Sequence, residues 1–466
     1  MSDAYAEFLA RKTTEAMPLG LDFVPDLNPA MFPYQRDVTA FLLRAGRGAA
    51  FLDTGLGKSL VALDWGRVVA EVENRPVLML APLAVAPQHV REARKFGLEA
   101  RVARHGDEVG PGLNIANYER LHHFRPEDFA GIILDESSII KSFTGKTTRA
   151  LMEWAAGLRW RLACTATPAP NDHMELGQHS QFLGVMDSCE MLSRFFIADQ
   201  RNMGRYRIKG HAVRPFWNWA ASWSRCMAKP SDLGYSDDGF DLPPLNLHRH
   251  VIRADVSVGR GEDAGGQMQL LRTPDTSATA IHREKRLTAD ARADRIAEIV
   301  AGEPAEPWII WCDTDYEADA LVARIAGAVE VRGSMPAETK EDRLVAFSTG
   351  AVRILVTKPS IAGFGLNWQH CARVAFVGLS FSYEAFYQAV RRCWRFGQVR
   401  PVEVHIAMAD TEEAIWKVIS RKSGDHDSMK TEMRAAMSRA HERRQVKLDY
   451  HPNVPAQLPG WLRGAA

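Results

Sequence analysis

Cysteine is scarce in this sequence, and its positions exclude two common kinds of scaffold. The 466 residues include six cysteines, and no two of them form a CxxC pair. A structural zinc site needs clustered cysteine or histidine ligands, and a disulfide framework needs closely spaced cysteines in an oxidising compartment. We therefore expect no zinc, no disulfides and a reducing environment.

Long apolar runs, internal repeats, low-complexity tracts and an excess of charge are also missing. No apolar stretch is long enough to cross a membrane, and the first residues lack the basic and apolar regions of a signal peptide. We therefore expect a cytoplasmic protein with no membrane partner. The formal net charge of +1 excludes a uniformly basic surface but allows a local basic patch. The length predicts two or three domains.

The most informative stretch present is a glycine turn at Asp53–Ser59, with the sequence DTGLGKS. It follows an apolar strand at 49–52 and precedes a predicted helix, which is the context of a phosphate-binding loop. In such a loop Lys58 would contact the β- and γ-phosphates of a nucleotide, and the Ser59 hydroxyl would hold Mg²⁺. Leu52 stands where the full pattern has glycine, so an ordinary glycine turn is the alternative. The other phosphate contacts would come from Thr54, Gly55 and Gly57.

A second apolar strand, at 131–134, ends in two adjacent carboxylates, Asp135 and Glu136. The carboxyl ends of parallel strands meet at one edge of a sheet, and ligands bind there. At that edge Asp135 would hold Mg²⁺, and Glu136 would orient or deprotonate an attacking water. A solvated strand end is the alternative.

Four further residues are candidates to sense the nucleotide. Tyr34 and Gln35 lie upstream of the glycine turn, where Tyr34 would stack on adenine and Gln35 would contact it through its amide; a plain helix cap is the alternative. Thr165 and Thr167 follow another apolar strand. They would hydrogen-bond the acidic pair and respond to the γ-phosphate, or form only a hydroxyl turn.

Apolar strands alternate with helical patterns along the whole chain, which predicts parallel, doubly wound α/β sheets. A second series of strands follows a predicted helix at 278–300, and it has no phosphate loop of its own. Its glycine turn would bring Gly365 to a nucleotide or phosphate backbone, or is simply a tight turn. The strands of this series are predicted at 308–312, 329–333, 353–357 and 374–378.

A predicted helix near 387–398 places Gln388, Arg392 and Arg395 on one face, at i, i+4 and i+7. Like charges on one helix face repel, and this cost is understandable if a triphosphate lies opposite. Arg392 and Arg395 would then act as arginine fingers on the charge of the transition state. A DNA-facing or solvated basic helix is the alternative.

The segment 200–231 differs in composition from the two series of strands, because it interleaves basic and aromatic residues and contains no acidic residue. This composition suits a surface that neutralises backbone phosphates and stacks on exposed bases. A small helical insertion whose tryptophans form its core is an equally good interpretation, and the two are compatible. The nucleic-acid contacts would include Arg205, Arg207, Lys209 and Trp217.

Taken in order, these motifs resemble the core of helicase superfamily 2, which includes the DEAD/DEAH-box proteins, and most closely its Snf-type branch of DNA translocases in the compact phage and bacterial form. The resemblance covers roughly residues 31–410. Several positions depart from the pattern of the branch: Ser137 and Ser138 replace Ala-His, and Arg391 replaces glycine. Leu52 also replaces a small residue, and 165–168 is Thr-Ala-Thr-Pro where remodellers commonly have Thr-Gly-Thr-Pro. The matching stretches are 33–35, 53–59, 81–82, 117–121, 135–136, 165–168 with Asn171, 363–367 and 388–398.

The resemblance implies two RecA-like domains with ATP in the cleft between them. It also implies that Arg392 and Arg395 reach the nucleotide from the second domain, and that nucleic acid lies over the turns near Pro82, Asn117 and Thr357. The predicted organisation is an N-terminal helix and loop (1–30), a first domain (31–245) with an insertion at about 172–245, a linker (246–280), a second domain (281–410) and a helical extension (411–466).

The predicted function is an ATP- and Mg²⁺-dependent motor on DNA that has little sequence specificity. An RNA helicase is one alternative. Another is an ATP-gated clamp that forms part of a restriction, repair or replication assembly. The polymer that stimulates ATP hydrolysis would distinguish these hypotheses.

Overall fold

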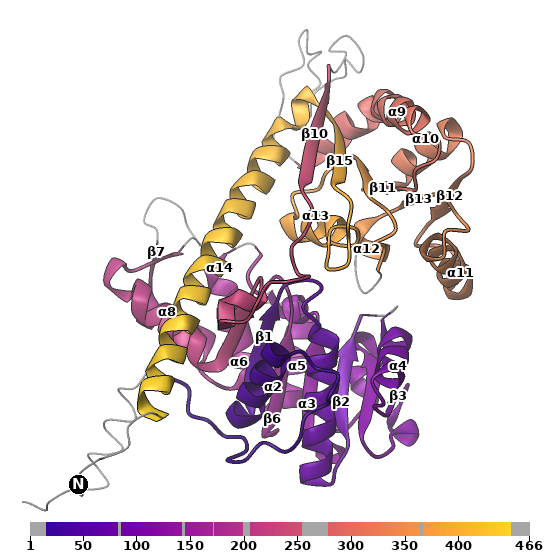
Figure 1. The fold of residues 1–466 in the computed structure, drawn as a ribbon. Coiled ribbons are helices and arrows are strands. Elements are labelled where there is room, and N and C mark those ends of the chain that lie inside the picture. Colours follow the sequence, from indigo (N-terminus) through magenta and orange to yellow (C-terminus); the bar gives the residue numbers. More distant parts are fainter. Residues whose placement is uncertain are drawn as a thin grey trace, which may run out of the picture.

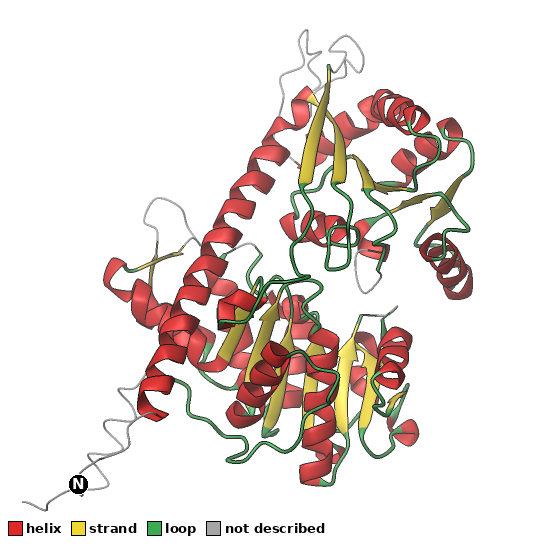
Figure 2. Cartoon of the chain, in the orientation of Figure 1, coloured by secondary structure: helices red, strands yellow, loops and turns green. Residues whose placement is uncertain are grey.

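A computed structural model of the protein describes residues 15–82, 85–141, 145–170, 172–198, 206–253, 278–362 and 367–448. Two α/β domains lie one above the other, and a long C-terminal helix runs beside both of them (Figure 1). Each domain is a twisted sheet with helices on its faces (Figure 2). The predicted fold class is therefore confirmed, with two parallel sheets and a helical C-terminal segment.

The first domain contains a seven-stranded sheet in the order β3-β4-β2-β5-β6-β1-β9. All neighbouring strands in it are parallel. Its strands are β1 (Arg47–Leu52), β2 (Val77–Ala81), β3 (Ala100–Val102), β4 (Leu113–Asn117), β5 (Gly131–Asp135), β6 (Trp160–Cys164) and β9 (Ser224–Met227).

Helices cover both faces of this sheet, which explains why its central strands β2 and β5 are almost entirely apolar. In β1, Ala50 and Leu52 pack into one hydrophobic cluster, while Ala49 and Phe51 pack into another, as the two-residue period of a strand requires. The first cluster includes side chains of α2 (Pro33–Ala45), α3 (Lys58–Glu73) and α4 (Ala86–Lys95). The second includes side chains of α5 (Lys146–Ala155) and α6 (Leu176–Leu183).

The second domain repeats this architecture with a six-stranded sheet in the order β10-β15-β14-β11-β13-β12. Its neighbouring strands are also all parallel. Its strands are β10 (Leu245–Ile252), β11 (Trp308–Cys312), β12 (Ala328–Val331), β13 (Ile354–Thr357), β14 (Arg373–Val377) and β15 (Val402–Ala409). Its helices are α9 (Ala278–Gly302), α10 (Asp315–Arg324), α11 (Ala337–Ser348), α12 (Pro359–Ala362) and α13 (Tyr383–Val390).

The basic and aromatic segment forms part of the first domain. It contains α8 (Val213–Trp223) and the strand β9, which pairs with β1. Trp217, Trp219 and Trp223 are at most 2% exposed and belong to one of the hydrophobic clusters of this domain. Nearby lie α7 (Ser188–Phe195) and an antiparallel pair of strands, β7 (Phe196–Ala198) and β8 (Tyr206–Ile208). The tryptophan core expected from the sequence is therefore observed, and the nucleic-acid surface, which is compatible with it, stays a prediction.

The C-terminal helix α14 (Glu413–Leu448) belongs to both domains. Near its start, Ile415 and Ile419 pack into the core of the second domain. Further along, Met429 and Met433 pack into the core of the first domain, beside α8 (Figure 1). The helix therefore connects the two domains.

Three local predictions differ from the structure. Residues 246–252, expected within a linker, lie in β10, and β15 was not expected as a strand. Helix α13 ends at Val390, so the predicted helix near 387–398 does not continue to Arg395. Within the described ranges, no helix is both long enough and apolar enough to cross a membrane.

Candidate active site

The loop from Asp53 to Ser59 connects β1 to the start of α3, as the sequence predicted. Gly55 and Gly57 have φ angles of +91° and +77°, in the left-handed region that favours glycine. A Cβ atom on Gly57 would lie 2.1 Å from Gln35 Nε2, and one on Gly55 would lie 2.5 Å from Phe396 Cβ. Both glycines are therefore required by conformation and by close approach, and the loop is tightly packed against both domains.

Lys58 is the first residue of α3, and its side chain folds back over the loop. Its Nζ atom donates to the carbonyl oxygen of Leu52 at 2.7 Å and to that of Asp53 at 3.3 Å. Burial lowers the pKa of Lys58. Three carboxylates oppose this shift, those of Glu136, Asp53 and Asp135. The lysine and the predicted acidic pair therefore share one site, and Ser59 follows on the same helix turn.

Asp135 ends β5, and its carboxylate faces a partner that the sequence did not reveal. The Oδ2 atom lies 2.8 Å from Nε2 of His89 on α4. Burial alone would raise the pKa of Asp135, but His89 and Lys58 hold it below its usual value. The carboxylate is therefore ionised at neutral pH. His89 is an isolated histidine in a basic helix, so nothing in the local sequence marked it.

Glu136 has a φ angle of +57°, which is uncommon for a residue with a side chain and typical of a constrained functional position. Its Oε1 atom accepts hydrogen bonds from Thr165 Oγ1 at 2.6 Å and from Ser138 Oγ at 3.1 Å. The Thr165 oxygen also accepts the backbone N–H of Thr167 at 3.0 Å. Burial raises the pKa of Glu136. The structure thus brings both threonines to the acidic pair.

Arginines of the second domain reach the same site from the turn that follows α13. Burial and the positive charge of Arg395 lower the pKa of the Arg392 guanidinium to about 9. The carboxylates of Glu136 and Asp135 oppose this shift and therefore attract Arg392. The positive charge of Arg395 also contributes to lowering the pKa of Lys58. Because the helix ends at Val390, these arginines do not share a helix face with Gln388. Instead Gln388 Oε1 accepts a hydrogen bond from Arg392 at 3.2 Å.

The residues expected to bind adenine lie against the phosphate loop. Tyr34 Oη and Gln35 Nε2 donate to the carbonyl oxygen of Leu56 at 3.1 and 3.0 Å. Tyr34 is only 2% exposed, and it packs against the rings of Phe32 and Phe240. Its ring therefore offers no free face for stacking on adenine in this structure. Gln35 contacts the loop directly. Thr54 donates its backbone N–H to Asp53 at 2.7 Å.

A cavity of about 660 Å³ lies between the two domains near the predicted nucleic-acid contacts. Pro82 and Arg91 line it from the first domain, and Lys340 lines it from the second. Asn117 ends β4, in register with the residue before Pro82. Thr357 is only 1% exposed and donates to the Val331 carbonyl oxygen, so it does not line the cavity surface.

The basic insertion offers fewer nucleic-acid contacts than expected. Arg207 is exposed on β8, whereas Lys209 Nζ donates to two carbonyl oxygens at the end of α7, at 2.7 and 3.1 Å. Trp217 is buried in the core and therefore cannot stack on bases in this structure. Arg205 and Gly365, together with Asn171, lie outside the described residues.

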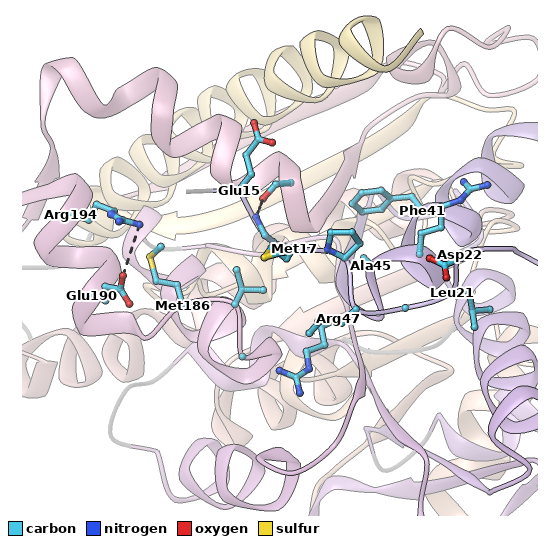
Figure 3. A pocket seen from close by; sticks show the side chains of 18 residues that line it. Glu15, Met17, Leu21, Asp22, Phe41, Ala45, Arg47, Met186, Glu190 and Arg194 are labelled. Atoms are coloured by element: carbon cyan, nitrogen blue, oxygen red, sulfur yellow. Dashed lines mark hydrogen bonds and ion pairs between the residues drawn. The ribbon is translucent and has the colours of Figure 1, made fainter. Parts of the chain in front are cut away.

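Another cavity, of about 570 Å³, lies in the first domain between residues 15–22, α2 and α7 (Figure 3). Its wall includes Arg47 and the ion pair of Glu190 with Arg194, which are 3.9 Å apart. None of the predicted site residues that the structure describes lines this cavity. It is therefore separate from the candidate active site.

Comparison with known proteins agrees with this geometry. Residues 291–397 match the family described as helicase conserved C-terminal domain. The chain is 23% identical over 448 residues to the mouse protein "DNA annealing helicase and endonuclease ZRANB3", covering 86% of this chain and 41% of the relative. It is 31% identical over 192 residues to the human "DNA excision repair protein ERCC-6-like", covering 35% of this chain and 15% of the relative. The chain thus spans less than half the length of these relatives. The resemblance found in the motifs is confirmed.

Proposed function

We propose that this chain is a helicase superfamily 2 motor of the Snf type, which couples ATP hydrolysis to movement along DNA. One observation carries this proposal. The phosphate loop of the first domain and the arginine-bearing turn of the second meet directly, because Arg391 donates to Asp53 at 2.6 Å. Beside this contact, Lys58 and the acidic pair lie close enough to Arg392 and Arg395 for their charges to shift one another's pKa. Such a site is complete only when the domains are together, so ATP turnover would open and close the cleft.

The residues divide the chemistry of hydrolysis between the two domains. Lys58 would leave the carbonyl oxygens of its own loop and bind the β- and γ-phosphates. Glu136, whose raised pKa suits a general base, would orient the attacking water and accept its proton. Thr165 holds Glu136 in place. Arg392 and Arg395 would stabilise the negative charge that develops on the transferred phosphoryl group.

The donors at the site fit a magnesium ion. Ser59 supplies a hydroxyl oxygen at the start of α3, and Asp135 supplies an ionised carboxylate at the end of β5. Mg²⁺ prefers such oxygen ligands and usually takes only one or two carboxylates from the protein, with phosphates and waters completing the shell. When bound, the ion would neutralise charge on the β- and γ-phosphates.

DNA would lie over the mouth of the 660 Å³ cavity between the domains, where Arg91 and Lys340 are on opposite sides, while Glu136 of the acidic pair and three other carboxylates also line this cavity. These two cations would contact backbone phosphates, so binding would depend on salt and would carry little sequence specificity. Pro82 and Asn117 lie at the strand ends beside this cavity. The relatives' names mention DNA, which favours DNA over RNA as the polymer.

Steady-state ATP hydrolysis tests the proposal. Wild type, Lys58→Ala and Glu136→Gln would each be assayed with duplex DNA, single-stranded DNA, RNA or no polymer. We expect stimulation of wild type by DNA. Lys58→Ala should lose ATP binding, and Glu136→Gln should keep binding but turn over about 10²–10⁴-fold more slowly, the usual contribution of a general base. Stimulation by RNA alone would indicate an RNA helicase. No stimulation by any polymer would contradict the motor and favour a clamp.

A further inference from the structure

Asp53, the first residue of the phosphate loop, is bound by side chains from distant parts of the chain. Its Oδ1 atom accepts a hydrogen bond from Tyr387 Oη at 2.6 Å. Its Oδ2 atom accepts from Arg391 at 2.6 Å and from Lys430 Nζ at 3.3 Å. Tyr387 and Arg391 belong to the second domain, whereas Lys430 lies on α14. We refer to these four residues as the Asp53 cluster.

The Asp53 cluster is buried, so its charges interact strongly. Asp53, Arg391 and Lys430 are 5%, 7% and 6% exposed. Burial alone would raise the pKa of Asp53, but Arg391 and Lys430 hold it well below its usual range. The carboxylate is therefore ionised. Two cations face one anion, which leaves an excess positive charge beside the loop that would bind a triphosphate.

Asp53 also controls the shape of the loop itself. Its Oδ1 atom accepts the backbone N–H of Thr54 at 2.7 Å, and its carbonyl oxygen accepts from Lys58 Nζ at 3.3 Å. A change in the position of Asp53 would therefore displace both the first peptide of the loop and the lysine. The surrounding helix fixes Lys430 in turn, because Met429 and Met433 pack into the first domain.

If the contact served only to hold the two domains together, it would not explain why position 53 carries an aspartate. An uncompensated carboxylate beside a phosphate-binding loop repels phosphate. A neutral residue at position 53 would avoid the repulsion without any need for buried cations. The arrangement instead makes the charge and position of the loop depend on the second domain and on α14.

We propose that Lys430 and Arg391 are positioning residues of the ATP site, which neutralise Asp53 and hold the phosphate loop in its binding conformation. The C-terminal helix is then part of the nucleotide site, although none of its residues needs to touch the nucleotide. This inference rests on the proposed ATPase function and extends it to the C-terminal helix that connects the two domains.

The test removes the charge of Lys430 and compares this variant with one in which a different lysine of the same helix is replaced. We expect Lys430→Met to raise the KM for ATP about five- to tenfold, in the range of coupling between contacting charges, and to change kcat less than about twofold. Lys430→Arg keeps the positive charge, so its KM for ATP should stay close to that of wild type. Lys417→Met replaces an exposed lysine on α14 and should change neither constant.

A double-mutant cycle shows whether Lys430 acts through Asp53. In an Asp53→Asn background the effect of Lys430→Met on KM should largely disappear, because the carboxylate that it neutralises is gone. An undiminished effect in that background would overturn the proposal.

Hydrogen–deuterium exchange without nucleotide provides a readout that does not need catalysis. Amides of 53–59 should exchange faster in Lys430→Met than in wild type, while those of β11 should be unchanged. Equal exchange of the loop in the two proteins would contradict the positioning role. If wild type hydrolyses no ATP but the exchange difference is present, the proposed ATPase function fails and the positioning of the loop stands.

Discussion

The two α/β domains share one architecture but contribute opposite kinds of group to the cleft between them. The first domain provides the phosphate loop and the carboxylates of Asp135 and Glu136. The second has no such loop among its described residues and provides the guanidinium groups of Arg392 and Arg395. Under the proposed function, the same fold would serve for nucleotide binding in the first domain and for charge stabilisation in the second. A catalytic site of this kind can be switched by the relative position of the domains.

The interiors of the two domains both contain contacting aromatic rings, but they differ in buried charge. In the first domain Trp219 contacts Phe216 and Trp223, and in the second Trp368 contacts Trp311 and Phe347. The second domain buries an ion pair in addition: Arg292 and Glu317 are both 0% exposed, and their side chains meet at 2.8 Å. Aromatic burial stabilises through area removed from water, whereas a buried ion pair is stable only as long as both partners are present.

The largest effect should follow from removing an arginine that the second domain contributes. Arg392→Ala should lower kcat about 10³-fold, as expected for an arginine finger, with a much smaller change in the affinity for ATP. Single-turnover hydrolysis and nucleotide titration would measure the two quantities separately. Arg286→Ala, an exposed arginine of α9, is the matched control. A loss of affinity as large as the loss of kcat would place Arg392 in ground-state binding instead.

The next effect concerns stability in the second domain. Arg292→Met would leave Glu317 buried without its cation, which should cost about 3–5 kcal/mol of unfolding free energy. Hydrogen–deuterium exchange should show faster opening of β11, with β1 of the first domain little changed. The control is Arg324→Met, because Arg324 pairs with exposed carboxylates on the surface, where ion pairs contribute less than about 1 kcal/mol. Comparable losses in both variants would show that the buried pair has no special role.

Part of the cleft could be predicted from sequence because its chemistry lies in short, local patterns. The loop at 53–59 and the adjacent acids at 135–136 each follow an apolar strand, and strand ends in a parallel sheet meet at one edge. Most strands were also predicted, since strands buried on both faces are continuous apolar runs. Strand β10 was missed because it is an edge strand with mostly exposed residues.

The rest could not be predicted because it depends on long-range contacts. Asp53 and Lys430 are 377 positions apart in the chain, and neither residue stands in a pattern that names the other. His89 is likewise an isolated residue of α4, paired with Asp135 only through the fold. Composition was also ambiguous for the tryptophans near Trp217, since aromatic residues among arginines fit both a base-stacking surface and a core.

The smallest effect concerns the junction of the two domains and depends on pH. His426 of α14 packs against the rings of Tyr383 and Tyr387, each 5.6 Å away between centroids. Burial lowers its pKa to about 3, and the cations Lys430 and Arg391 add to the shift. The folded protein therefore keeps this histidine neutral, whereas the unfolded chain binds a proton near pH 6.5.

The sign of the pH effect follows from that difference. Stability contributed by neutral His426 is fully present above pH 6.5 and is lost as the pH falls towards the folded-state pKa. At pH 5 the loss should be about 2 kcal/mol. His426→Phe should therefore flatten the decline in unfolding free energy between pH 6.5 and pH 5, as measured by urea denaturation at each pH. His179→Phe serves as the comparison, because His179 is buried entirely within the first domain and its pKa is lowered to about 4. Both variants should flatten the pH dependence of stability, but only His426→Phe should also alter the pH dependence of exchange in α14. An unchanged slope in His426→Phe would mean that the junction opens and admits water before the domains unfold.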